Sequence, residues 1–287
     1  MSPPSRKTVL SSLGASLLAA CSPLTTFNTL TPKDPALRQA RGIAFGDESR
    51  HRLDVYAPRR GAREAPVLVF FYGGGWDSGR RQDYAFAGHA LAAQGFLTIV
   101  PDYGLFPHVR YPGFLHDGAL AIRWASRNAA RFGGDPARIL LAGHSAGAYN
   151  AVMLGLNSGL TEAVGVDPSH IRAMAGLSGP YNFLPLDVPA TINAFGHYPD
   201  LPATQPFNYA RPDAPATFLA WGDKDTVVGP QNIAALAPAL KAQGVKVETK
   251  IYPDVDHPGL VLALSRPFRG KAPVLADMSR FLMANAG

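Results

Sequence analysis

The stretch "ILLAGHSAGAYNA" (residues 139–151) places Ser145 between two glycines at the end of an apolar run. The run predicts a strand and residues 146–157 predict a helix, so Ser145 lies at a strand-to-helix corner. Gly143 and Gly147 leave out side chains that would clash at such a corner, and the helix start directs free N–H groups toward it. This context of G-x-S-x-G predicts a nucleophilic serine. The alternative is one small residue in a helix packed closely on a sheet.

Outward from this corner, strand and helix patterns alternate along the chain. The continuous apolar run "VLVFFY" (67–72) is typical of a central parallel strand. The alternation predicts an α/β fold, with a mostly parallel central sheet and helices on both faces. The predicted strands are 52–58, 67–72, 96–103, 138–142, 171–177, 215–221 and 246–252, and the predicted helices are 83–94, 114–131, 146–157, 231–243 and 273–285.

One interval, about residues 179–214, lacks clear periodicity and is rich in Pro, Asn, Asp and aromatic residues. An irregular segment of that length in a compact domain is usually functional. We expect a short cap-like insertion that forms a lid or a pocket wall. Its aromatic residues are pocket candidates together with Trp76; the candidates we single out are Trp76, Tyr181 and Phe183, with Phe195, Tyr198 and Phe207 as further aromatics of the insertion.

The N-terminal residues predict an export signal of the lipoprotein type over residues 1–21. Arg6 and Lys7 precede an apolar stretch that is too short to span a bilayer. The stretch ends in "LAAC", which resembles the lipobox of bacterial lipoproteins, so Cys21 is the expected lipid attachment site. This predicts the bacterial cell envelope as the location. An ordinary cleavage site, with a secreted or periplasmic protein, and an uncleaved tail are the alternatives.

The composition indicates how the rest of the chain is organised and which partners it has. Residues 22–41, rich in Pro, Thr and Ser, are expected to be a linker, and residues 42–287 one domain. Apolar residues make up 47% and charged residues 17%, which excludes a disordered chain. The net charge of +6 comes from scattered Lys and Arg residues, so we expect no nucleic-acid partner and a membrane contact only through the lipid anchor.

A nucleophilic serine needs a base, and the base needs an orienting acid. Asp225 follows the strand predicted over 215–221 and precedes Val227, which suits an orienting acid; Asp223 is the competing choice, although it more plausibly shapes the turn. His257 follows the last predicted strand and precedes an apolar helical start. Ser145, Asp225 and His257 are therefore the candidate catalytic residues.

Three successive glycines follow the apolar run in "FFYGGGWDSG" (70–79). Such a loop can present backbone N–H groups to the negative charge that develops in a transition state. Gly74 and Gly75, with Ala146 at the helix start, are the expected oxyanion-hole donors. The alternative is a flexible turn without a catalytic role.

These segments together resemble the esterase/lipase type of α/β hydrolase, similar to bacterial carboxylesterases of the hormone-sensitive-lipase-like group and to kynurenine formamidases. The matching segments are "YGGGW" (72–76), "PDYGLFPHVRYPGFLHDGALAIRW" (101–124), "GGDPARILLAGHSAGAY" (133–149), "GDKDTVV" (222–228) and "DHPGLVL" (256–262). The resemblance implies an α/β-hydrolase fold and the roles given above. The family commonly has His at the position of Tyr72 and often Arg at the position of Gly104, which puts local hydrogen bonding and rigidity in question.

The expected function is hydrolysis of a small-molecule carboxylic ester, of short-chain or aryl type, through an acyl-enzyme on Ser145. We expect no cofactor and no metal. An arylformamidase-like amidase remains an alternative, as does a non-catalytic surface-anchored binding protein on a hydrolase fold. The sequence leaves the oligomeric state open.

Overall fold

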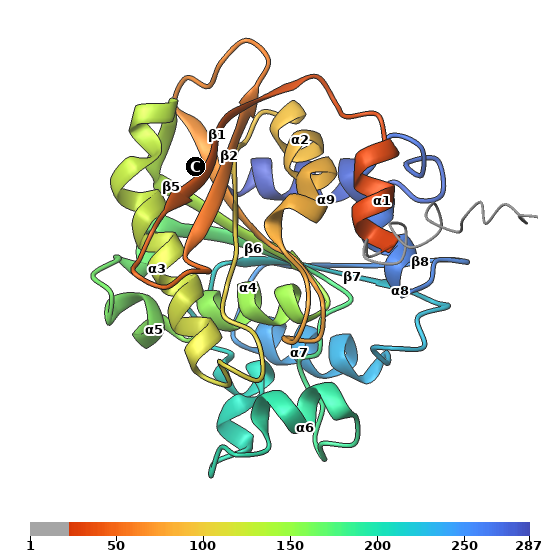
Figure 1. The fold of residues 1–287 in the computed structure, drawn as a ribbon. Coiled ribbons are helices and arrows are strands. Elements are labelled where there is room, and N and C mark those ends of the chain that lie inside the picture. Colours follow the sequence, from red (N-terminus) through yellow and green to blue (C-terminus); the bar gives the residue numbers. More distant parts are fainter. Residues whose placement is uncertain (1–22) are drawn as a thin grey trace, which may run out of the picture.

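The apolar runs of the sequence form the middle of an eight-stranded sheet in the computed structural model, which describes residues 23–287 (Figure 1). The strand order is β1-β2-β4-β3-β5-β6-β7-β8, and only β2 runs antiparallel to its neighbours. This confirms the mostly parallel sheet. The strands are β1 (Ala36–Ala44), β2 (Arg52–Pro58), β3 (Ala65–Phe71), β4 (Leu97–Pro101), β5 (Gly134–His144), β6 (Ile171–Leu177), β7 (Ala216–Gly222) and β8 (Val247–Tyr252).

Helices cover both faces of the sheet, as the alternation predicts. In Figure 1, α2 (Ala85–Ala93) and α9 (Val274–Ala284) lie above the sheet, and α4 (Ala146–Leu156) and α7 (Gln231–Ala242) lie below it. α3 (Gly113–Asn128) packs against α4. Every position of β3 and β4 is buried, because helices shield both of their faces. The shorter helices are α1 (Pro23–Leu30), α5 (Ser158–Glu162), α6 (Pro189–Phe195) and α8 (His257–Leu262).

The linker expected over residues 22–41 is wrong for its described part, which holds α1 and most of β1. Contacts with distant segments order this stretch. The Phe27 ring packs edge-on against Phe86 at 5.3 Å between centroids, and Asp34 pairs with Arg269 through two hydrogen bonds of 3.0 and 2.8 Å. None of these contacts is visible in the local composition, which is why the segment looks like a linker.

The insertion over residues 179–214 joins β6 to β7 and lies at the bottom of Figure 1. It contains α6 and two short 3-10 turns, and aromatic residues join it to the domain. Phe195 is fully buried, and its ring lies 4.9 Å from Trp76 and 5.2 Å from Tyr149. The insertion is therefore packed onto α4 and the glycine loop.

The expected export signal and Cys21 lie outside the described residues. Between residues 23 and 287, no helix has both the length and the apolar character needed to cross a bilayer.

Candidate active site

Ser145 stands at the corner between β5 and α4 in a conformation that L-residues rarely adopt, with φ +55° and ψ −125°. Such strain persists only where the surroundings fix the backbone. Here the Ser145 amide donates to the Leu177 carbonyl on the neighbouring strand β6 at 2.9 Å. The corner thus directs the Ser145 side chain into the cavity, away from the packing of α4 on the sheet.

The two glycines beside Ser145 permit close backbone contacts. A Cβ on Gly143 would lie 2.2 Å from the Gly147 carbonyl oxygen. A Cβ on Gly147 would lie 2.2 and 2.3 Å from the carbonyl oxygens of Phe71 and Tyr72. The small residues therefore serve both explanations offered by the sequence, because they permit the corner and the close packing of α4 on β3.

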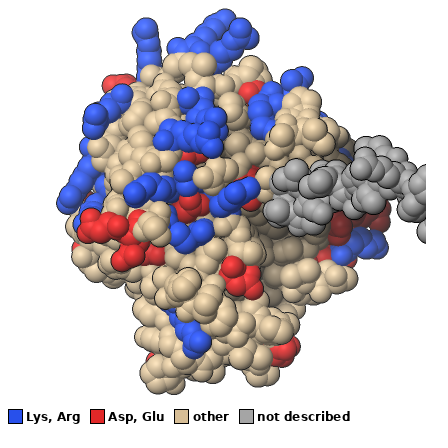
Figure 2. Space-filling model, in the orientation of Figure 1, with Lys and Arg blue, Asp and Glu red and all other residues tan. Residues whose placement is uncertain are grey.

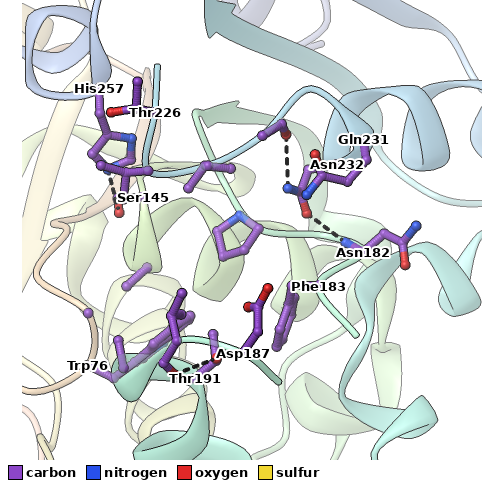
Figure 3. A pocket seen from close by; sticks show the side chains of 18 of the residues that line it. Trp76, Ser145, Asn182, Phe183, Asp187, Thr191, Thr226, Gln231, Asn232 and His257 are labelled. Carbon is purple, nitrogen blue, oxygen red and sulfur yellow. Dashed lines mark hydrogen bonds between the residues drawn. The ribbon is translucent and has the colours of Figure 1, made fainter. Parts of the chain in front are cut away.

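A continuous hydrogen-bond chain runs from Ser145 to a buried carboxylate. His257 Nε2 lies 2.9 Å from Ser145 Oγ (Figure 3). On the other side of the ring, His257 Nδ1 lies 2.8 Å from Asp225 Oδ2. An ionised carboxylate only accepts hydrogen bonds, so the proton sits on Nδ1 and leaves Nε2 to accept from the serine hydroxyl. The structure thus brings together the three residues that the sequence singles out.

Asp225 is held as an anion beneath the site. Burial by itself would raise the pKa of its carboxyl, but the hydrogen bonds from His257 and from the Val228 amide outweigh burial and lower the pKa. The Val227 amide also donates to Oδ1, at 2.8 Å. The competing Asp223 is exposed and accepts from the Asp254 amide at 2.7 Å, so it shapes a turn instead.

The glycine loop after β3 lines the same cavity. Gly74 has φ +131°, and a Cβ there would lie 2.3 Å from the Ser78 carbonyl oxygen. In the part of the chain that the structure describes, the N–H groups of Gly74, Gly75 and Ala146 have no hydrogen-bond partner, although all three residues line the cavity. Three free donors beside a serine hydroxyl suit a developing oxyanion.

Tyr72, where the family commonly has His, is tied to Arg50. The Arg50 guanidinium donates to the Tyr72 hydroxyl at 2.7 Å and to the Gly79 carbonyl at 2.9 Å, so it grips both ends of the glycine loop. The same guanidinium donates to the Tyr103 carbonyl at 2.7 Å, and the Tyr72 hydroxyl donates to Asp102 at 3.1 Å. Arg50 precedes β2 in the sequence, and no local pattern singles it out.

Gly104, where the family often has Arg, does not loosen its segment. Its amide donates to Asp117 Oδ2 at 2.8 Å, and the other oxygen of that carboxylate bonds His51 Nε2 at 2.9 Å. A Cβ at Gly104 would lie 2.4 Å from a methyl group of Val109. The segment around Gly104 is therefore held by close packing and by the buried Asp117 carboxylate, and it does not need the arginine that the family often has.

The cavity above Ser145 has a volume of about 640 Å³. Figure 3 shows Ser145 and His257 on one side and Phe183, Asp187 and Thr191 of the insertion on the other. The insertion therefore forms a pocket wall, and Trp76 and Phe183 line the cavity as expected.

Tyr181 does not reach the cavity, so its assignment to the pocket is wrong. Its side chain is fully buried, and its amide donates to Asn232 Oδ1 at 2.6 Å. A Cβ on Gly176 would lie 1.8 Å from the Tyr181 hydroxyl, and one on Gly179 would lie 2.5 Å from it. The ring fills space that these glycines leave, which the sequence pattern of an irregular segment does not reveal.

His144 is a contact of the site that the sequence reading did not recognise. Its Nε2 lies 3.0 Å from the carbonyl oxygen of His257, and the two rings are 4.7 Å apart. Burial, reinforced by the nearby His257, lowers the pKa of His144 to about 3. A neutral His144 therefore donates to the backbone of His257 and holds the histidine loop on the serine corner. Its place directly before Ser145 is the one signal that could have indicated this contact.

Among residues 23–287, no group of three or more His, Cys, Asp or Glu side chains is arranged to hold a metal ion.

Comparison with known proteins finds a matching family, related sequences and similar structures. The sequence profile of the BD-FAE family matches residues 53–240. The probable isoprenylcysteine alpha-carbonyl methylesterase ICMEL1 of Oryza sativa subsp. japonica is 36% identical over 151 residues, which are 51% of this chain and 36% of that protein. The chain thus spans about a third of the length of that relative.

Two further proteins are similar over most of the chain. Carboxylesterase NlhH of Mycobacterium tuberculosis is 32% identical over 277 residues, with 87% of this chain and 85% of that protein covered. The crystal structure of esterase B from Lactobacillus Rhamnosis superposes with a TM-score of 0.77 at 21% identity, covering 91% of this chain and 90% of that one. The latter likeness concerns the fold.

Proposed function

The chain belongs to the BD-FAE family of α/β hydrolases, and on this premise we propose that it hydrolyses carboxylic esters with Ser145 as the nucleophile. The observation that carries the proposal is the hydrogen-bond chain from Ser145 through His257 to the buried Asp225 at the floor of the cavity. A serine hydroxyl is a weak nucleophile at neutral pH, and an oriented imidazole is the group that activates it.

The geometry supports a two-step reaction. Ser145 Oγ attacks the ester carbonyl while His257 Nε2 takes its proton, and the anionic Asp225 stabilises the imidazolium. The N–H groups of Gly74, Gly75 and Ala146 receive the oxyanion. His257 then passes the proton to the departing alcohol, which leaves an acyl-enzyme on Ser145. Water, activated by His257, releases the acid and restores the serine.

The size of the cavity bounds the substrate. A volume of about 640 Å³ accommodates a small ester, and the insertion that walls it contains one short helix, α6. We therefore propose short-chain or aryl esters as substrates. The names of the relatives agree with an ester: one is a carboxylesterase and another a methylesterase.

A chain-length series of nitrophenyl esters on the purified protein tests the proposal, with formanilide included for the amidase alternative. We expect turnover of the short esters and a drop in kcat on the order of a millionfold in Ser145→Ala. Thermal unfolding of both proteins shows that the variant keeps its fold. No Ser145-dependent turnover of any ester or of formanilide would overturn the proposal, and turnover of formanilide alone would favour the amidase.

The N-terminal pattern supports a separate proposal about location. We propose that Cys21 carries a lipid that anchors the domain to a membrane of the bacterial envelope. "LAAC" after a charged and then apolar segment supports it. Labelled palmitate should be incorporated by the wild type and not by Cys21→Ser; an unlabelled wild type would contradict the anchor.

A further inference from the structure

Among residues 23–287, Asp187 is the one Asp, Glu, Lys or Arg residue that lines the cavity. It belongs to the insertion, directly before Val188 and α6. Figure 3 shows its carboxylate directed into the cavity, between Phe183 and Thr191 and across from Ser145. Within residues 23–287 this carboxylate forms neither an ion pair nor a hydrogen bond. Its charge is therefore available to a bound molecule.

The surroundings of the cavity do not balance this charge. Within the described part of the chain, no Lys or Arg lines it. The charged residues that directly adjoin lining residues in the sequence are Asp77, Asp83, Asp225 and Asp256. Of these, Asp83 is paired with Arg80 and Asp225 with His257. By contrast, Figure 2 shows Lys and Arg gathered over the upper part of the molecule and few charges on the lower part, where the insertion lies. The cavity is thus negative in a chain whose net charge is +6.

An aromatic ring lies near the same carboxylate. Phe183, which is part-buried and lines the cavity, lies beside Asp187 in Figure 3. A carboxylate together with ring faces is a suitable environment for an ammonium group, because ring faces attract cations. An anionic group would meet an unpaired like charge there, which selects against it.

Resting on the proposed ester hydrolysis, we propose that the cavity prefers esters that carry a positively charged group, such as an ammonium, over neutral ones, and that Asp187 is the residue that determines this preference. Ammonium binding requires no change in the chemistry at Ser145. The charge on Asp187 lies across the cavity from Ser145 and attracts the cationic group of a bound ester.

The expected effect is moderate because Asp187 is exposed to solvent. Water and salt screen a charge at such a position, so we expect a preference of about fivefold at low ionic strength. Since the Debye length falls to about 8 Å at physiological salt, the preference should shrink as salt is added.

Butyrylcholine and 3,3-dimethylbutyl butyrate test the proposal, because they share shape and differ in the quaternary nitrogen. The readout is the ratio of their kcat/KM values in wild type, Asp187→Asn and Asp187→Lys. We expect the ratio to fall about fivefold in Asp187→Asn and further in Asp187→Lys. Asp47→Asn removes an exposed carboxylate outside the cavity and should leave the ratio as in wild type.

Calorimetric binding of the same two esters to Ser145→Ala separates this proposal from the proposed hydrolysis. In that variant the charge preference is measured without turnover, so it survives even if the protein is not an esterase. Equal ratios in wild type and Asp187→Asn, together with equal binding of the two esters to Ser145→Ala and to its Asp187→Asn double variant, would overturn the role of Asp187.

Discussion

Around Ser145 the backbone itself is held in place, whereas across the cavity the insertion is held by its side chains. At the serine corner and in the glycine loop, any added Cβ at Gly147 or Gly74 would meet a carbonyl oxygen within 2.3 Å. The insertion packs through ring contacts, such as those of Phe195, and leaves Val188 and Ile192 exposed at 45% and 49%. The serine corner and the glycine loop tolerate almost no change of shape, whereas the exposed side chains of the insertion, Val188 and Ile192, can be changed more freely.

This difference separates chemistry from choice of substrate. Ser145, Asp225 and His257 each follow the carboxyl end of a parallel strand, so the sheet fixes their relative positions. The insertion contributes Phe183 and Asp187 to the opposite wall and contributes no member of the hydrogen-bond chain. Changes in the first region should lower kcat, and changes in the second should alter KM or the preference among substrates.

The largest effect that keeps the serine is expected from Asp225→Asn. The amide cannot hold the Nδ1 proton of His257, so the wrong tautomer is favoured and kcat should fall about ten-thousandfold. Steady-state kinetics on a nitrophenyl ester measures it. Asp223→Asn, two residues away and exposed, is the matched control and should stay near wild type. The reverse result would identify Asp223 as the orienting acid.

Gly74→Ala should lower kcat by about a hundredfold to a thousandfold, the usual cost of losing one oxyanion donor. The new methyl group would meet the Ser78 carbonyl, and the φ of +131° does not suit alanine, so the loop must move. Gly61→Ala is the control, because Gly61 also has a positive φ, +80°, but faces open space. If both variants lose only stability and keep kcat, the glycine loop is no oxyanion hole.

These two predictions rest on features that the sequence alone indicates, for a physical reason. Continuous apolar runs predict the central strands, and parallel strands bring their carboxyl ends to one edge of the sheet. Residues just past three such ends, Ser145, Asp225 and His257, must then lie near one another. The central strands, the longer helices that flank them and these three positions were therefore predictable.

Features that depend on contacts far along the chain were not predictable. Neither β1 nor α1 contains a continuous apolar run. Contacts such as that between Asp34 and Arg269, 235 residues apart, hold them in place. The orientation of Tyr181 depends on the space at Gly176, on another element. Periodicity describes only local preference, so it misses order that tertiary contacts impose.

The free energy of unfolding should depend on pH through His144, which is buried within the rigid region. Burial lowers the pKa of His144 to about 3 in the folded protein, below its ordinary 6.5. Between these pH values the unfolded chain therefore binds a proton that the native protein does not. The free energy of unfolding should therefore fall by about 1 kcal/mol for each pH unit lost in this range. Urea unfolding at pH 4, 5 and 6 measures the slope, which should flatten in His144→Asn. An unchanged slope would contradict a buried neutral histidine.

Arg50→Ala should lower kcat about tenfold and change KM little. The guanidinium holds the glycine loop at Tyr72 and Gly79, so its loss loosens donors that act in the transition state. Kinetics on a single nitrophenyl ester gives both constants. Arg52→Ala, two residues further at the start of β2, is the control, because its guanidinium bonds the His51 carbonyl and not the glycine loop. A rise in KM with kcat unchanged would assign Arg50 to substrate binding.

The smallest effect is expected from Phe183→Ala in the insertion. The Phe183 amide donates to Gln205 Oε1 at 2.8 Å, so the backbone should stay in place when the ring is removed. The cavity then widens on the side away from Ser145, and KM for a short ester should rise about threefold while kcat stays within about twofold. For esters with longer acyl chains, kcat/KM should fall less than for the short ester, or should rise. Phe207→Ala removes a ring of the insertion that does not line the cavity and should leave the chain-length profile unchanged. If Phe183→Ala instead lowered kcat as far as Gly74→Ala does, the insertion would belong to the rigid region and the separation of chemistry from substrate choice would fail.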